Sequence, residues 1–383
     1  MGRKLPIGIQ GFEKLRTEDF LYVDKTEYIF RLVHNNVPYF LSRPRRFGKS
    51  LLLSTMRAYW EGRKELFNGL AIERLEQDNS DAWKPYPVFY FDFNGENYEE
   101  TTIEEVLDQH LSEWEEIYGD KYKQNTLGYR FEKLLEMASK KTGLRCVVLV
   151  DEYDKPLLEA IESKNLEEHI KKVFKGFFSR LKKADEYIQF IFITGVSKFH
   201  KVSIFSDLNH LRDISMTEDC AALCGITETE IGKYFTDEIK AFAEKRKMTV
   251  QECREALRRQ YDGYHFHPDG EAVYNPYSLL SALLDRDFGS YWFETGTPTF
   301  LVRQLRKNRF DVQSFSDKTI FASEAVLKDY TGDNRDPVPL LYQTGYLTII
   351  DYDSSRRRYT LGFPNEEVKD GFWESMIQQQ ENS

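Results

Sequence analysis

Four apolar runs of strand length occur in the first half of the chain, and amphipathic stretches of helical length separate them. The runs are continuous rather than alternating, which is typical of strands buried on both faces of a sheet. Strands that alternate with helices indicate a parallel sheet covered by helices on each side. The predicted strands cover residues 37–42, 86–94, 145–152 and 188–195, and the predicted helices cover 49–62, 102–142 and 166–184.

The pattern becomes predominantly helical beyond about residue 217. Segments 227–247 and 249–263 each open with a threonine that can cap a helix, with a glutamate or glutamine close behind. Two β-rich runs within 344–363 flank a polar turn at 353–355, which predicts a hairpin. We therefore predict an α/β fold with a P-loop NTPase core at 1–215, a helical lid at 216–300, a winged-helix-like module at 301–372 and a flexible tail at 373–383.

The segment SRPRRFGKS, residues 42–50, joins the first predicted strand to the first predicted helix. Its last three residues, Gly48, Lys49 and Ser50, match the end of the phosphate-binding motif G-x-x-x-x-G-K-[ST]. Gly48 permits a turn that directs N–H groups at phosphates, Lys49 reaches the β and γ oxygens, and Ser50 ligates Mg²⁺. Arg43 stands where the motif has its first glycine. A solvated basic turn is the alternative for this segment taken alone.

The third predicted strand carries two carboxylates, Asp151 and Glu152, at its C-terminal end. Parallel sheets bind ligands at this edge. We predict that Asp151 holds Mg²⁺ through water and that Glu152 polarises the attacking water. The fourth predicted strand leads to Thr194 and Ser197, either of which can sense the γ-phosphate or position the water. The alternatives are a solvated acidic turn and two hydroxyls that cap the following turn.

Several ordered motifs closely resemble the bacterial AAA-ATPase-like family of P-loop proteins. They include SRPRRFGKS, VVLVDEYDKPL, ITGVSKFHKVSIFSDLNHLRDIS, YDGYHF, VYNPYSLL, YWFETGTPTFL and LLYQTGYLTI, and the resemblance covers about residues 5–370. The family includes members with arginine at the first loop position, which implies that Arg43 is a family variation. The resemblance implies binding of ATP through Gly48, Lys49 and Ser50, with Asp151 and Glu152 as the acidic pair.

The predicted site combines the loop with the ends of two strands. Its nucleotide-binding residues are Arg45, Arg46, Phe47, Gly48, Lys49, Ser50 and Leu51, its catalytic residues are Glu152, Asp151, Lys49, Thr194 and Ser197, and its metal ligands are Ser50 and Asp151. The two arginines can grip phosphate, act across a subunit interface or solvate the loop. Arg212 is a further finger candidate, with a surface ion pair to Asp213 or Asp207 as the alternative. Residues 274–276 are candidates for the adenine side.

Members of this family usually carry a nuclease-like domain of the PD-(D/E)xK type after the ATPase region. The sequence has no strand ending in Glu-x-Lys after an upstream Asp, so either this member lacks the domain or the sequence is a truncated one, and we expect no nuclease activity in the chain. A nuclease-like module or another protein is a candidate partner. His265 and His267 alternate along the chain and form a weak candidate metal pair.

Charge restricts the candidate partners further. The formal net charge is −10, so the surface as a whole repels nucleic acid and anionic lipid. Contact with DNA would need a local patch, for which Arg356, Arg357 and Arg358 in the predicted hairpin are candidates. A charged hairpin tip that blocks edge pairing is the alternative. No run approaches the roughly 20 apolar residues of a membrane span, so we expect a cytoplasmic protein without membrane contact.

Together these patterns predict a Mg²⁺-dependent ATPase that couples hydrolysis to movement of the helical lid. One alternative is a switch or scaffold that binds ATP without appreciable turnover and regulates a partner. Another is a DNA-binding regulator that acts through the C-terminal module.

Overall fold

The computed structural model describes residues 4–35, 37–98, 100–292, 320–328 and 336–381. A five-stranded sheet lies at its centre, with the strand order β2-β3-β4-β1-β5 and all neighbours parallel. The strands are β1 (Tyr39–Ser42), β2 (Val88–Asp92), β3 (Cys146–Asp151), β4 (Ile188–Gly195) and β5 (Arg212–Asp213). The predicted parallel sheet is therefore confirmed, and β4 separates the loop-bearing strand from the acidic strand.

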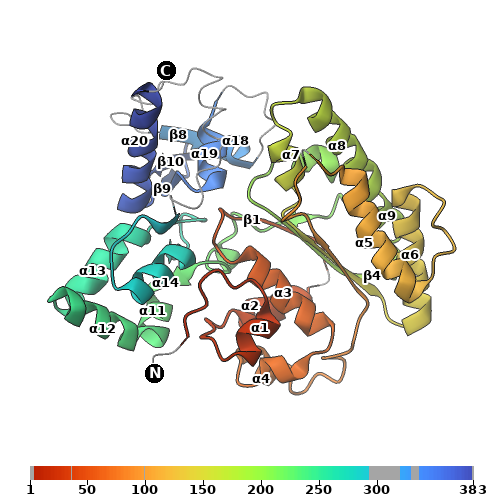
Figure 1. Ribbon diagram of the computed structural model, residues 1–383, viewed down its shortest axis with the longest axis horizontal. Coiled ribbons are helices and arrows are strands. Elements are labelled where there is room, and N and C mark those ends of the chain that lie inside the picture. The colour runs from red at the N-terminus through yellow and green to blue at the C-terminus, as the bar shows by residue number, and fades with distance from the viewer. Residues whose placement is uncertain (1–3, 36, 99, 293–319, 329–335, 382–383) are drawn as a thin grey trace.

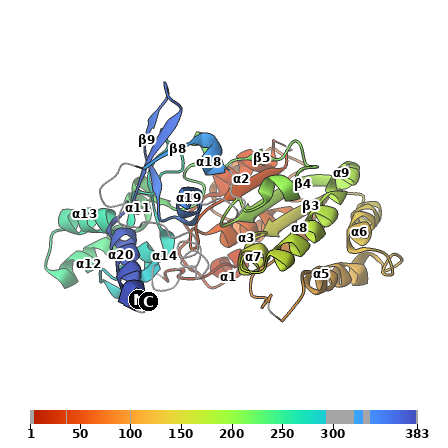
Figure 2. The same ribbon diagram turned by 90° about the horizontal axis from the view of Figure 1, so that it is seen from above.

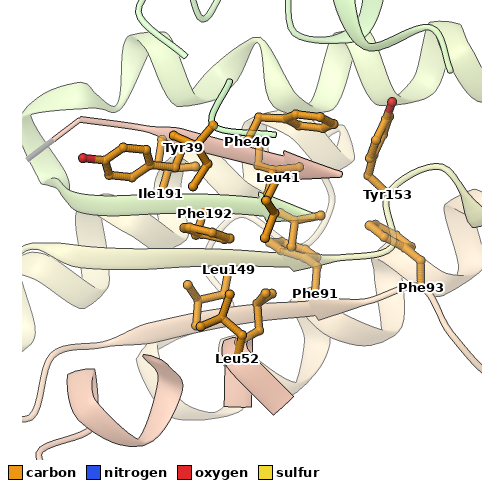
Figure 3. Packing of buried hydrophobic residues seen from close by; sticks show 14 of the residues in the cluster. Tyr39, Phe40, Leu41, Leu52, Phe91, Phe93, Leu149, Tyr153, Ile191 and Phe192 are labelled. Carbon is orange, nitrogen blue, oxygen red and sulfur yellow. The ribbon is translucent and has the colours of Figure 1, made fainter. Parts of the chain in front are cut away.

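Continuous apolar sequence produces these strands because both faces of the sheet are covered. All six residues of β3 are buried, as are all four of β1. Leu52 approaches the sheet from α3 (Lys49–Trp60), and aromatic side chains such as Phe91 and Phe192 fill the interior (Figure 3). Helices α5, α6 and α8 lie on the side opposite α1 and α3 (Figures 1 and 2).

The predicted helix at 102–142 is wrong in its length, because the segment forms two helices that pack together. These are α5 (Ile103–Tyr118) and α6 (Leu127–Thr142). A capping box of Thr102 and Glu105 begins α5, and Gly119 ends it with φ +116°, which favours glycine. The other core helices are α1 (Phe12–Thr17), α2 (Thr26–Val33), α4 (Ala71–Leu75), α7 (Lys155–Glu159), α8 (Lys164–Phe178), α9 (Arg180–Lys183) and α10 (Lys201–Ile204).

A helical region follows the core and has an apolar cluster of its own. Its helices are α11 (Glu228–Tyr234), α12 (Thr236–Arg246), α13 (Val250–Tyr261) and α14 (Pro276–Asp285). Strand β6 (Ile226–Thr227), which precedes α11, pairs antiparallel with β7 (Val273–Tyr274), which precedes α14. Capping boxes at Thr227 and Thr249 confirm the two predicted helix starts. Leu21 belongs to this cluster, and Leu5 and Ile7 pack against it, so the N-terminal segment is part of its core.

The C-terminal segment contains the predicted hairpin, with one strand more than expected. Strands β9 (Thr348–Asp353) and β10 (Arg358–Gly362) pair antiparallel, and β8 (Ile320–Ser323) adds a third strand beside β10. Figure 2 shows this hairpin extending away from the rest of the chain. Helices α18 (Glu324–Lys328), α19 (Val338–Thr344) and α20 (Glu366–Glu381) complete the segment, so the predicted tail at 373–383 begins as helix.

The C-terminal segment shares one buried apolar cluster with the core sheet. Leu340, Leu361 and Phe372 belong to the same cluster as Phe192. Residues 301–319 and 329–335 of the predicted winged-helix-like module lie outside the described residues, so that assignment and the predicted boundaries stay predictions.

Candidate nucleotide-binding site

The loop after β1 has the conformation that its glycine predicts. Gly48 takes φ +88° and ψ +19°, a left-handed conformation that costs glycine little, and it forms the N-cap of α3. The loop borders a cavity of about 420 Å³. All seven predicted nucleotide-binding residues line this cavity, namely Arg45, Arg46, Phe47, Gly48, Lys49, Ser50 and Leu51.

Arg43 is buried behind the loop rather than exposed in the cavity. Its guanidinium donates to Ser42 O (3.0 Å), Ser215 O (2.7 Å) and Cys220 O (2.9 Å) and lies 3.8 Å from the ring centroid of Phe266. Arg43 is not among the described residues with positive φ. The arginine therefore tolerates a position where glycine is usual, because the backbone there has an ordinary conformation.

Lys49 contacts both the loop and the residue that follows the acidic strand. Its Nζ donates to the carbonyl oxygens of Arg43 (3.0 Å) and Pro44 (3.2 Å) and lies 3.7 Å from Oε1 of Glu152. A lysine ammonium held by two loop carbonyls beside a carboxylate can turn to a phosphate group when an anion enters the cavity.

Asp151 ends β3 and is buried, whereas Glu152 lines the cavity. The carboxylate of Asp151 accepts hydrogen bonds from Thr194 Oγ1 (2.7 Å) and from the hydroxyl of Tyr90 (3.3 Å). Burial and the nearby carboxylates of Asp151 and Asp92 raise the pKa of Tyr90, so its hydroxyl stays protonated and able to donate. Asp151 is therefore held in place by fixed donors on both neighbouring strands.

Thr194 and Ser197, which the sequence left undecided, occupy different positions. Thr194 Oγ1 donates to Asp151 and accepts from the backbone N–H of Glu152 (3.3 Å). Ser197 donates instead to Oδ2 of Asp154, through its N–H (2.6 Å) and its hydroxyl (2.7 Å). Thr194 thus contacts both acidic residues of the candidate site, and Ser197 holds the turn that follows β4.

Of the two predicted Mg²⁺ ligands, Ser50 lines the cavity, whereas Asp151 is buried at the end of β3 and is not among the lining residues. Mg²⁺ prefers hard oxygen ligands and keeps several waters when it binds beside phosphates. The hydroxyl of Ser50 on α3 and the carboxylate of Asp151 on the adjacent strand β3 are oxygen ligands of this kind. Within the described ranges, no group of three or more His, Cys, Asp or Glu side chains is arranged to hold a metal ion by itself.

Several cavity residues were missed in the sequence. Asn94 and Gly95 follow β2, Lys155 comes three residues after Glu152, and further lining residues lie within 6–10, 21–25, 223–226 and 277–280. The ends of β2 and β3 could have indicated the first three, because parallel strands deliver their C-terminal residues to one edge. No local pattern marks the N-terminal segment as part of a site.

Other candidates lie away from the cavity. Of residues 274–276, only Pro276 lines it, since Tyr274 donates to Glu228 and Asn275 caps α14. Arg212 is exposed on β5. His265 contacts Gly270 O, His267 accepts from the N–H of Asp269, and Arg356, Arg357 and Arg358 are exposed at the hairpin.

Two sequence comparisons relate this chain to known proteins. A family model described as Predicted AAA-ATPase matches residues 6–205, which include the loop, the acidic strand and β4. A curated relative from Azotobacter chroococcum mcd 1, described as an uncharacterized protein in the vnfD 5′ region, is 38% identical over 379 residues, 98% of this chain and 70% of the relative. No helix in the described part of the chain has the length and apolar character of a membrane span.

Proposed function

This chain belongs to the predicted AAA-ATPase family, and from that premise we propose that it binds ATP with Mg²⁺ and hydrolyses it. One observation carries the proposal. Lys49 and Glu152, which come from elements about a hundred residues apart in sequence, lie 3.7 Å apart at one cavity. Phosphoryl transfer needs little beyond a positioned phosphate, a positioned water and fixed charges. The site has a residue for each of these tasks.

Binding is assigned to the loop. The N–H groups at the start of α3 and the ammonium of Lys49 hold the phosphates, because a helix N-terminus favours negative charge. Arg45 and Arg46 border the same cavity and add positive charge. The apolar residues of the helical region, among them Ile226 and Leu280, suit the base and sugar.

Hydrolysis is assigned to the acidic strand. Glu152 accepts a proton from the attacking water while the bond between the γ-phosphorus and its bridging oxygen breaks, which releases ADP and inorganic phosphate. Ser50 and Asp151 would hold Mg²⁺, which neutralises phosphate charge when bound. The hydroxyl of Thr194 holds Asp151 and the backbone of Glu152 in position through its two hydrogen bonds.

Movement of the helical region completes the proposal. The guanidinium of Arg46 lies 4.5 Å from the ring centroid of Tyr277 on α14, so a loop cation is stacked on the helical region. A bound phosphate competes with Tyr277 for this cation. Binding and loss of the γ-phosphate would thereby break and restore the contact between Arg46 and Tyr277, and so change the position of the helical region relative to the loop.

Binding is tested by thermal unfolding with and without ATP–Mg²⁺. Wild type should gain about 3 kcal/mol at a nucleotide concentration 100 times Kd, by mass action. Lys49→Ala should gain much less, because the phosphates lose their lysine. Equal shifts in the two proteins, or no shift in wild type, would contradict nucleotide binding at this loop.

Hydrolysis is tested by single-turnover kinetics on wild type and Glu152→Gln. The variant keeps the shape of the side chain but cannot accept the proton, so we expect the rate to fall at least about 100-fold with ATP affinity retained. Absence of turnover in both proteins, with binding intact, would instead identify a nucleotide-dependent switch or scaffold.

A further inference from the structure

Lys155 lies at the candidate site but has no role in the proposal so far. It begins α7, three residues after Glu152, and its N–H donates to Glu152 O (3.0 Å), so one turn positions both residues. Its side chain is 24% exposed and lines the same cavity as Lys49 and Glu152. In the structure its ammonium pairs with Glu159, one helical turn further on.

Other basic side chains at the cavity make contacts that differ from those of Lys155. Among the described residues, the lining contains Lys25, Arg45, Arg46, Lys49 and Lys155. Lys25 donates to Ala222 O (2.9 Å) and forms an ion pair with Glu230. Arg46 stacks on Tyr277, and Lys49 belongs to the loop itself. Lys155 is the cavity cation that follows the acidic strand.

The helical region brings apolar and uncharged groups to the cavity. Within the described ranges, its lining residues are Leu223, Cys224, Gly225, Ile226, Pro276, Tyr277 and Leu280. Among the described cavity residues, positive charge for the transferring phosphoryl group is therefore available from the core and not from the helical region. Lys155 can supply this charge from within the core.

We infer that Lys155 is a catalytic cation, which donates a hydrogen bond to the γ-phosphoryl group as negative charge develops on its oxygens. The inference rests on the proposed ATPase function. Cations aimed at the transferring group accelerate phosphoryl transfer because they interact more strongly with the transition state than with bound ATP. The side chain leaves Glu159 and turns to the phosphate, and no covalent bond to the protein forms.

The ion pair with Glu159 does not prevent this movement. Ion pairs between partly exposed side chains contribute little to stability, because water competes for both charges. Glu159 is 32% exposed. It keeps the ammonium beside the cavity and also competes with the phosphate for it, so the two members of the pair have opposite expected effects on hydrolysis.

The test compares Lys155→Met and Lys155→Arg with wild type. Loss of the charge should lower kcat about 100-fold or more, while Kd for ADP changes less than about threefold. Lys155→Arg should recover a substantial part of kcat, because the charge returns. Lys155→Met should also lose affinity for the transition-state mimic formed by ADP and aluminium fluoride, a readout independent of turnover. Retained ADP binding shows that the variant is folded.

Glu159→Gln is the matched control, because it removes the same ion pair and leaves the lysine. Its kcat should equal or exceed that of wild type. Similar losses in Lys155→Met and Glu159→Gln would mean that only the ion pair matters, and would overturn the inference. Unchanged kcat in Lys155→Met would overturn it as well. If wild type itself shows no turnover, the proposed function fails together with the inference, whereas the other two outcomes arise only in an active protein.

Discussion

Arg43 occupies the position at which phosphate-binding loops usually carry their first glycine, and its side chain has become part of the interior. Three backbone carbonyls depend on its guanidinium, and two of them, Ser215 and Cys220, lie more than 170 residues away in the sequence. The residue thus fastens the front of the loop to the segment that leads into the helical region.

Restoring the glycine at this position should therefore harm the protein. We expect Arg43→Gly to lower the free energy of unfolding by about 3 kcal/mol or more, because buried carbonyls lose their donors. Chemical denaturation measures the change. Arg46→Gly is the matched control, since Arg46 has φ +67° and glycine relieves that conformation. Equal stability of Arg43→Gly and wild type would contradict the anchoring role.

Asp154 is a second residue whose burial has a measurable effect. Its carboxyl accepts from the N–H of Val196 and from both donors of Ser197, and burial raises its pKa to about 6. An unfolded Asp titrates near 3.9, so between about pH 4 and 6 the folded protein binds more protons at this site than the unfolded chain. The contribution of Asp154 to stability is therefore largest below about pH 4 and falls as pH rises to about 6.

The measurement is the free energy of unfolding of wild type and Asp154→Asn across this window. The difference between them, wild type minus variant, should fall by about 2 to 3 kcal/mol from pH 4 to pH 7, because the amide does not titrate. A difference that is constant with pH would show that the carboxyl keeps an ordinary pKa.

At the scale of elements, the position of β4 between β1 and β3 explains how the site is organised. Leu41 of β1 pairs with Thr194, and the hydroxyl of Thr194 reaches Asp151 at the end of β3. One strand therefore links the phosphate-binding loop to the acidic pair. The turn after β4 is held separately, through Asp154.

Substitutions on the two sides of this turn should have different effects. Thr194→Val removes the hydrogen bonds to Asp151 and Glu152, and we expect kcat to fall about 10- to 100-fold with nucleotide affinity retained, as for other outer-shell contacts. Ser197→Ala should instead lower stability by about 1 to 2 kcal/mol and leave kcat of the folded protein unchanged. Hydrolysis and denaturation assays on both variants test this division, and the reverse assignment of effects would contradict it.

Sequence reasoning predicted the elements whose conformation depends on local sequence patterns. The central strands are continuous apolar runs because helices cover both faces, and glycine is favoured at position 48 because the backbone there is left-handed. The break between α5 and α6 was missed although Gly119 marks it, because the helical periodicity resumes after a short polar segment.

Contacts between distant segments were beyond sequence reasoning. Burial of Arg43 depends on Ser215, Cys220 and Phe266, none of which carries a local signal. The third strand β8 pairs with β10 across many intervening residues. The choice between Thr194 and Ser197 likewise depended on which carboxylate each one meets.

At the scale of the whole molecule, the helical region, Trp292 and the C-terminal segment all contact the loop. Tyr277 of the helical region stacks on Arg46, the indole N–H of Trp292 donates to Arg45 O (3.1 Å), and Gly345 packs against Pro44. Figure 1 shows the helical region and the C-terminal segment beside each other next to the core. A change in the conformation of the loop would therefore alter its contacts with both the helical region and the C-terminal segment.

Gly345 tests whether the C-terminal segment supports nucleotide binding. It ends α19 with φ +92°, and a Cβ atom there would lie 2.8 Å from side-chain atoms of Pro44. Gly345→Ala should therefore displace the loop and weaken ATP binding about tenfold or more, a change of about 1.4 kcal/mol, measured as Kd.

Gly69→Ala is the matched control for this substitution. Gly69 has φ +79° and no heavy atom within 4 Å of the Cβ position, so it shares the backbone strain without the contact. It should lose stability but keep the Kd of wild type. Comparable weakening of ATP binding in both variants would attribute the effect to general destabilisation.

The positions of the cavity residues along the chain also determine the stage of protein synthesis at which the cavity can form. Its walls combine residues 6–10, near the beginning of the chain, with residues 223–226 and 276–280. The ribosome therefore completes the entire sheet before the last wall emerges. Until Leu280 has left the exit tunnel, the loop of the nascent chain has only part of the enclosure around it, and the apolar cluster that contains Leu21 still lacks the residues that α14 contributes.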